Sequence, residues 1–94
     1  MTTRPSAAQL RLLRWMDEDQ WIETSTLTFL VAAPSDRRDV AHWRRAHRHV
    51  YAMCRRLVAD GLVETQIPSV EREWRLTSAA SAALTAAEGE EVGA

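Results

Sequence analysis

The segment from Ser35 to Asp60 limits the possible folds of this 94-residue chain more than any other part of it. At 100° per residue, its apolar and basic side chains separate onto opposite sides of one helix. The apolar side carries Val40, Trp43, His47, Val50, Cys54, Leu57 and Val58, and the basic side carries Arg44, Arg45, Arg48, His49, Ala52, Arg55 and Arg56. Other elements must cover the apolar side, and the basic side is left for solvent or a partner.

Both ends of this long helix carry boundary signals. Ser35 and Asp36 are good N-caps, and Gly61 stands where helices often end in a left-handed residue. The spacing predicts a helix that runs to Asp60. It leaves open whether that helix is unbroken or consists of two helices that meet near Ala46.

A first helix is predicted near the N-terminus. Ser6 and Gln9 form a capping-box pattern, and apolar residues then recur at helical spacing to about Glu18. Trp21 and Ile22 are typical of a short buried connection or a strand of a single pair.

The segment 24–33 is ambiguous. Its alternating apolar residues and β-branched side chains favour a strand, whereas its Ser/Thr-rich start can cap a short helix that ends before Pro34. We predict the helix, because the family resemblance described below requires a helix before the long one.

A β-hairpin is predicted after the long helix. Residues 62–67 and 71–76 have strand composition, and Pro68 and Ser69 form the turn between them. The return strand places Trp74 and Leu76 on one face.

An Ala-rich helix closes the predicted domain. Thr77 or Ser78 caps this helix, which runs to about Glu88, and the small acidic residues 89–94 form a disordered tail. Length and composition allow one α+β domain over residues 1–88. Without a signal peptide or an apolar run of membrane-spanning length, and with one cysteine, we expect a cytoplasmic protein that does not bind membranes.

The net charge of −1 hides an uneven distribution. Seven arginines and two aspartates lie between Asp36 and Arg56, a local charge of +5, and the rest of the chain carries −6. Such asymmetry indicates an anionic partner.

The stretch HVYAMCRRLVADGLVET, followed by EWRLTSAASAAL, resembles the winged helix-turn-helix regulators, nearest to the MarR-like and PadR-like bacterial repressors. The most specific part runs from Arg55 to Glu64 and continues at Arg75 to Thr77. The resemblance covers about 40 residues. It implies three helices, a two-stranded β-hairpin wing and a short C-terminal helix, and a repressor without enzymatic activity that binds double-stranded DNA.

In that family the recognition helix lies in the DNA major groove. The resemblance therefore implies groups of DNA-binding residues with different roles. Candidate base or groove contacts are Arg44, Arg45, Arg48 and His49, and candidate phosphate contacts are Tyr51, Arg55 and Arg56. An arginine that donates two hydrogen bonds to a guanine contributes about 1–3 kcal/mol of discrimination.

The wing departs from the family. Its tip carries Glu71 and Glu73 against Arg72 and Arg75, so its net charge is near zero where a basic tip is usual. Either Arg72 alone reaches DNA or the wing has another role. The alternative function is a winged-helix module that docks an acidic protein and does not bind DNA.

The sequence gives little support for catalysis. His42 and His49 lie on one side of the long helix, but no third ligand is near in sequence, so we predict neither a metal site nor a cofactor. Cys54 and His47 fall on the apolar side, which favours a packed thiol and a hydrogen-bonded histidine over a nucleophilic pair.

Four tryptophans are many for a chain of this length. Trp43 and Trp74 are predicted core residues where the long helix meets the hairpin, whereas Trp15 and Trp21 fit either the core or a subunit interface. Because regulators with one recognition helix usually pair to read two half-sites, we expect a homodimer, formed through the first helix or the Ala-rich last helix.

Overall fold

The computed structural model describes residues 4–32, 38–68 and 70–93. Within them the chain is α+β, with four helices and one antiparallel sheet of three strands, as predicted for the fold class. The elements in chain order are α1 (Ala7–Leu13), β1 (Ile22–Glu23), α2 (Thr24–Val31), α3 (Val40–Ala59), β2 (Val63–Gln66), β3 (Glu73–Leu76) and α4 (Ser78–Gly93).

The sheet brings a strand from the N-terminal third of the chain beside the C-terminal hairpin, with β3 as the central strand. Its order is β1-β3-β2, and β3 pairs antiparallel with both neighbours. Ile22 lies opposite Trp74 in one pair of strands, and Val63 lies opposite Leu76 in the other. Of the two predictions for residues 21–22, the short strand is therefore the one that forms, over Ile22–Glu23.

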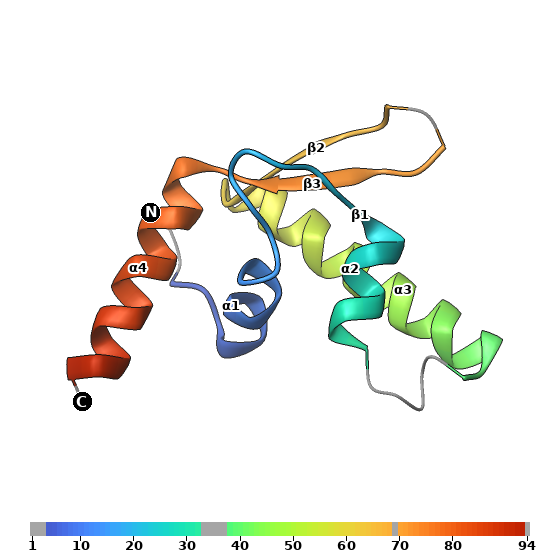
Figure 1. Cartoon of the computed structure of the whole chain (residues 1–94), viewed down its shortest axis with the longest axis horizontal. Coiled ribbons are helices and arrows are strands. Elements are labelled where there is room, and N and C mark those ends of the chain that lie inside the picture. Colours follow the sequence, from blue (N-terminus) through green and yellow to red (C-terminus); the bar gives the residue numbers. More distant parts are fainter. Residues whose placement is uncertain (1–3, 33–37, 69, 94) are drawn as a thin grey trace.

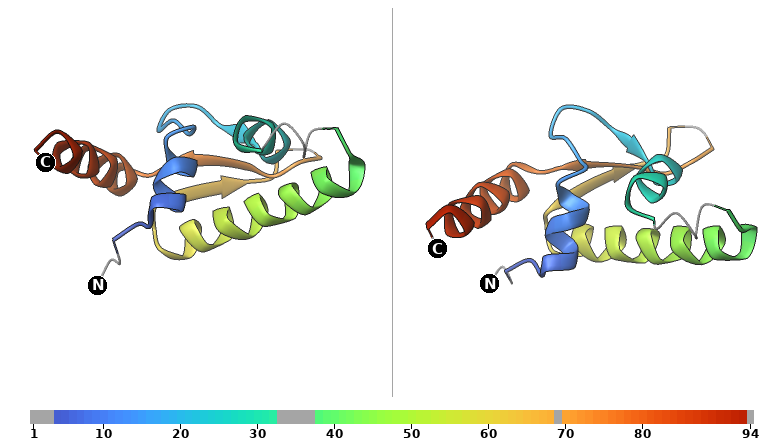
Figure 2. Two further views of the ribbon diagram at one scale, coloured as in Figure 1. Left: turned by 90° about the horizontal axis from the view of Figure 1, so that it is seen from below. Right: turned by 60° about the horizontal axis from the view of Figure 1, so that its bottom comes forward.

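The hydrophobic core lies between α3, the sheet and α1. Helix α3 contributes Val50, Cys54 and Leu57, all buried, and β3 contributes Trp74 and Leu76. The other buried apolar side chains of the cluster are Leu12, Leu13, Met16, Leu27, Leu62, Val63 and Ala80. Both views in Figure 2 show α1 crossing α3 near its C-terminal end, while the N-terminal half of α3 extends away from this crossing.

The predicted capping box of α1 is confirmed, but the predicted end of the helix is wrong. Ser6 Oγ accepts from the Gln9 amide at 3.1 Å, and the Ser6 amide donates to Gln9 Oε1 at 2.8 Å. The helix ends at Leu13 rather than Glu18. The chain leaves the helix because Asp17 forms a local turn, accepting from the Asp19 amide at 2.7 Å, and its carbonyl accepts from the Leu76 amide.

Residues 24–31 form the helix α2, so the predicted helix is confirmed over the strand alternative. The buried residues are Thr24, Leu27 and Thr28, which follow helical spacing rather than strand alternation. The Thr28 hydroxyl donates to the Thr24 carbonyl at 2.7 Å, which satisfies it inside the fold.

Helix α3 is continuous over 20 residues, which settles the question left open near Ala46. Its N-cap is Asp39, whose carboxylate accepts from the amides of Ala41 and His42. The helix thus begins at Val40, later than the N-caps predicted at positions 35 and 36, which lie outside the described residues. Val40 is 68% exposed and not part of the core, because the first turns of α3 extend beyond the elements that cover the rest.

The predicted hairpin forms with shorter strands than expected. β2 and β3 are each four residues long, and Trp74 and Leu76 are both buried, as their predicted common face requires. The Thr77 hydroxyl accepts from the Ala80 amide at 3.2 Å at the start of α4. Helix α4 then continues to Gly93, past the predicted end at Glu88 and into the segment predicted as a tail.

Gly61 ends α3 with a φ of +77° and has nothing within 4 Å of the position of an added Cβ. We expect Gly61→Ala to lower the free energy of unfolding by about 1–2 kcal/mol, because only the left-handed backbone is penalised. Gly89, inside α4 and also in open space, provides the matched control: Gly89→Ala is expected to stabilise by about 0.5–1 kcal/mol. Urea unfolding of both variants measures this, and equal effects at the two sites would contradict it.

Candidate nucleic-acid interface

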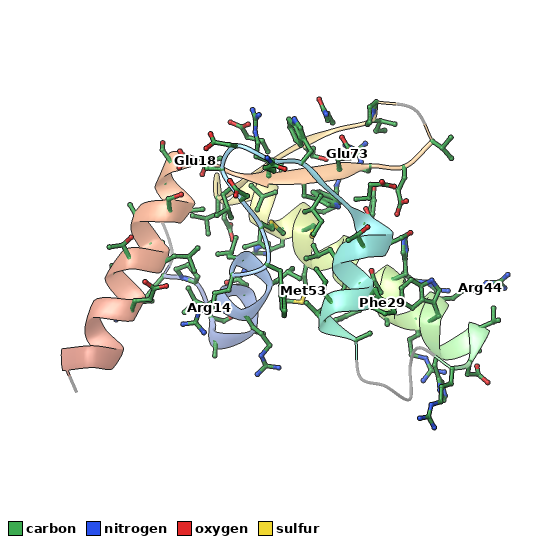
Figure 3. All side chains as sticks on the ribbon, viewed as in Figure 1. Arg14, Glu18, Phe29, Arg44, Met53 and Glu73 are labelled. Atoms are coloured by element: carbon green, nitrogen blue, oxygen red, sulfur yellow. The ribbon has the colours of Figure 1, made fainter. Side chains whose placement is uncertain are left out.

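The outward face of α3 concentrates positive charge without internal compensation. Its five arginines, Arg44, Arg45, Arg48, Arg55 and Arg56, are all exposed, and the helix contains no acidic residue. Figure 3 shows Arg44 extending away from the body of the molecule. Close like charges on one helix repel each other, so an anionic ligand stabilises this arrangement.

One acidic residue lies at each end of the helix. Asp39 is engaged as the N-cap, and its hydrogen bonds from the backbone of His42 and Ala41 lower the pKa of its carboxyl. Asp60 lies 3.6 Å from Arg56 in a mostly exposed pair of the kind that contributes little. Among the described residues, no carboxylate pairs with the other four arginines of α3.

Five of the predicted contact residues line two hollows along α3, whereas Arg55, Arg56 and Arg72 line neither. The larger hollow, of about 530 Å³, opens between α3 and the start of α2 and is lined by Ser25, Trp43, Arg44, His47, Arg48 and Tyr51. The other, of about 340 Å³, is lined by Val31, Ala32, His42, Arg45, Ala46, His49 and Val50. Arg44, Arg48 and Tyr51 are thus brought together, while Arg45 and His49 lie at a separate hollow next to the end of α2.

Tyr51 is half-buried and packs its ring edge-on against Trp74, with 5.5 Å between ring centroids and an interplanar angle of 78°. Its burial distinguishes it from Arg55 and Arg56, the other predicted phosphate contacts, which are exposed. Tyr51 therefore lines the larger hollow and also packs against the core residue Trp74.

A cluster that the sequence did not predict joins the β2–β3 hairpin to α2 and α3. Glu71 Oε1 accepts from the amide and the hydroxyl of Ser25, each at 2.5 Å, and lies 3.7 Å from His47 Nε2. Burial raises the pKa of Glu71, but hydrogen bonds with Ser25, Glu23 and His47 together lower it, so the pKa of its carboxyl lies below the usual range. The hydrogen bond to Glu71 raises the pKa of Glu23 beside it. Ser25 and Glu71 are 46 positions apart, so no local sequence pattern predicts their contact.

Arg72, the predicted contact of the wing, is held within the hairpin. Its Nη1 donates to Thr65 Oγ1 at 3.2 Å, and its carbonyl accepts from the amide and the hydroxyl of Thr24. The guanidinium therefore lies against β2, whereas the exposed residues at the hairpin tip are apolar: Ile67 at 57% and Val70 at 96%.

The thiol and the imidazoles show no catalytic arrangement. Cys54 is completely buried, and burial raises the pKa of its thiol to about 12, so it remains protonated at neutral pH. His42 and His49 are exposed along α3. Within the described part of the chain, no group of three metal-ligating side chains gathers at one place, and no helix has the length and apolar character needed to cross a bilayer.

The four tryptophans have different environments. Trp74 is fully buried, as predicted, whereas Trp43 is half-buried and forms a wall of the larger hollow. Trp21 stacks under the Arg75 guanidinium at 4.3 Å, and Arg75 also binds Glu64 at 2.7 Å. Trp15 is 49% exposed after α1.

Comparison with known proteins identifies no relative. No protein-family model matches the chain, and neither a curated protein nor a solved structure matches it significantly.

Proposed function

We propose that this protein binds double-stranded DNA through the outward face of α3 and acts as a transcriptional regulator, in the manner of a repressor. The observation that carries the proposal is the exposed row of five arginines on one helix that contains no acid. A helix of this length extends about 30 Å, and the major groove, about 12 Å wide, admits a helix.

The fold supports a winged-helix arrangement. The element order α1-β1-α2-α3-β2-β3 is compatible with it, and so is the sheet that pairs β1 with the hairpin. One feature departs from the simplest helix-turn-helix: eight residues, 32–39, connect α2 to α3, where three or four are usual. The longer connection adds two arginines to the sequence that precedes α3, Arg37 and Arg38.

In this proposal some exposed residues of α3 contact base edges and others contact phosphates. Arg44 and Arg48, in the N-terminal half of α3, are placed to reach base edges, with Arg45 and His49 on the adjoining side. Arg55 and Arg56, near its C-terminal end, contact phosphates, and Tyr51 contacts a phosphate beside Arg44 and Arg48, with which it lines one hollow. Arg72, already bound to Thr65, contributes less. Two copies of the chain would read two half-sites about one helical turn apart.

A salt titration tests the proposal. In a mobility-shift or fluorescence-anisotropy assay with mixed-sequence duplex, we expect a dissociation constant of about 10⁻⁴–10⁻⁶ M at physiological salt and tighter binding at low salt. The logarithm of the affinity should fall linearly with the logarithm of the salt concentration, with a slope of about −4 if four or five arginines neutralise phosphates. Absence of binding at tens of micromolar protein and low salt would contradict DNA binding.

The second candidate is a winged-helix module that docks an acidic protein surface through the same arginines. The uncharged wing tip favours it, since a wing that grips phosphates is usually basic. Under this alternative the duplex gives no shift, whereas an acidic protein is retained in a salt-dependent manner.

A further inference from the structure

The end of the β2–β3 hairpin is apolar and exposed. Val70 is 96% exposed, Ile67 is 57% exposed, and Pro68 between them is exposed as well. Residues 67–70 contain no charged side chain. Trp74 and Leu76 of the same hairpin are buried, so the exposed apolar side chains at its tip are not needed for its packing onto this protein.

The charged residues next to the tip are turned back toward the protein. Glu71 binds Ser25 and lies beside His47, and Arg72 donates to Thr65. Glu73, one position further, accepts from the side chain of Gln66 at 2.9 Å. The tip can therefore meet a partner with its apolar side chains and without a charge of its own.

The same contacts fix the tip beside the basic face of α3. Glu71 lies 3.7 Å from His47 of α3. His47 lies one helical turn after Arg44 and directly before Arg48 in the sequence, and all three side chains line the same hollow. Figures 1 and 2 show the hairpin loop and the N-terminal half of α3 extending toward the same end of the molecule. A polyanion bound to Arg44 and Arg48 thus passes close to the hairpin tip.

We propose that Ile67 and Val70 enter the minor groove of the duplex that α3 binds, where they act as an apolar wedge that bends the DNA. This inference rests on the proposed function and adds a second contact of a different kind. Apolar side chains inserted at a base step unstack it in part and kink a duplex by about 20–90°. The wing would then contribute by deforming DNA rather than by neutralising phosphates.

The dimensions of the loop suit this role. Six residues, 67–72, follow the last paired positions, Gln66 and Glu73, and reach at most about 10 Å beyond them. This is enough for side chains to reach the floor of a minor groove about 7.5 Å deep. A two-stranded ribbon does not fit a groove about 6 Å wide, so entry of the tip requires the groove to open, and opening accompanies bending.

The double variant Ile67→Ser/Val70→Ser tests the wedge. Both positions are exposed, so the substitutions should leave the thermal midpoint unchanged. The probe is a duplex of about 25 base pairs with a fluorophore at each end, selected from a random pool by the unmodified chain. The unmodified chain should raise energy transfer between the ends. The variant should bind about 10-fold more weakly and leave the end-to-end distance at the value of free duplex.

Two controls separate the wedge from simple proximity. Trp15→Ser removes exposed apolar surface after α1 and should change neither affinity nor bending. Ile67→Lys/Val70→Lys places charges at the tip, so it should bind at least as tightly as the serine variant and still fail to bend the duplex.

The possible results distinguish failure of the hairpin wedge from failure of DNA binding by α3. If the unmodified chain binds duplex without bending it, or the serine variant binds and bends as the unmodified chain does, the wedge is wrong and DNA binding by α3 stands. If the unmodified chain binds no duplex, both proposals fail. If the serine variant loses only the retention of an acidic protein, the tip is a protein contact and the wedge is likewise wrong.

Discussion

Replacing Arg44 and Arg48 together by alanine is expected to weaken binding to duplex DNA by about 100-fold, and each single replacement by about 10-fold. Both side chains line the larger hollow on the exposed face of α3, and no carboxylate among the described residues pairs with either. Removal therefore takes away a contact with DNA and leaves no unpaired acid in the protein. Fluorescence anisotropy at fixed low salt measures the effect, and the slope of affinity against salt should decrease by about 1 per arginine removed.

Arg11→Ala provides the matched control for these variants. Arg11 is an exposed arginine in the last turn of α1, outside the α3 surface. Its removal lowers the net charge by the same amount as Arg48→Ala, so a purely global effect of charge would weaken binding equally. We expect a change of less than about twofold. Equal losses for Arg11→Ala and Arg48→Ala would rule out α3 as the specific DNA surface.

Trp74→Ala is expected to have the largest effect on stability, lowering the free energy of unfolding by about 3–5 kcal/mol. Trp74 is fully buried at the centre of the sheet, and Tyr51 packs against it. Its indole Nε1 donates to Thr24 Oγ1 at 2.8 Å, and that hydroxyl in turn donates to the Arg72 carbonyl. Alanine leaves a cavity and removes the donor to a buried hydroxyl. Since a chain of this length has about 5–14 kcal/mol in total, the loss is a large fraction.

Urea unfolding followed by far-ultraviolet circular dichroism measures this loss without depending on tryptophan emission. Trp74→Phe helps to separate the two contributions, because it keeps an aromatic ring in the site and removes the indole N–H donor with the five-membered ring that carries it. We expect it to cost about 1–2 kcal/mol. A Trp74→Ala variant as stable as the Phe variant would show that the cavity closes without cost and would contradict the central packing role of this side chain.

Local patterns in the sequence predicted the elements of the fold better than their ends. The capping box at Ser6, the helical face of α3 and the strand composition on either side of Pro68 each depend on neighbours a few positions apart, and each element formed. The end of α1 was misplaced because a contact with β3, made by Asp17, takes the chain out of the helix. The start of α3 was placed too early because several residues in succession can cap a helix, and Asp39 does so.

The candidate site was predicted in its composition but not in its arrangement. The angular spacing along α3 separated the exposed arginines from Val50, Cys54 and Leu57. It did not show that Arg44 and Arg45, adjacent in sequence, line different hollows, since this depends on how α2 crosses α3. The contacts of Glu71 with Ser25 and His47 depend on elements far apart in sequence, and no periodicity reports them.

The hydrogen bonds around Thr24 also bear on how the chain folds. Its hydroxyl joins residues 48 and 50 positions away, and β1 pairs with β3 across a similar separation. Closing so long a segment must precede these contacts, which slows folding relative to that of a simple helical bundle. A fragment that contains only α3 and the hairpin lacks the partners that orient the hairpin. The orientation of the hairpin against α3 therefore depends on contacts between residues about 50 positions apart.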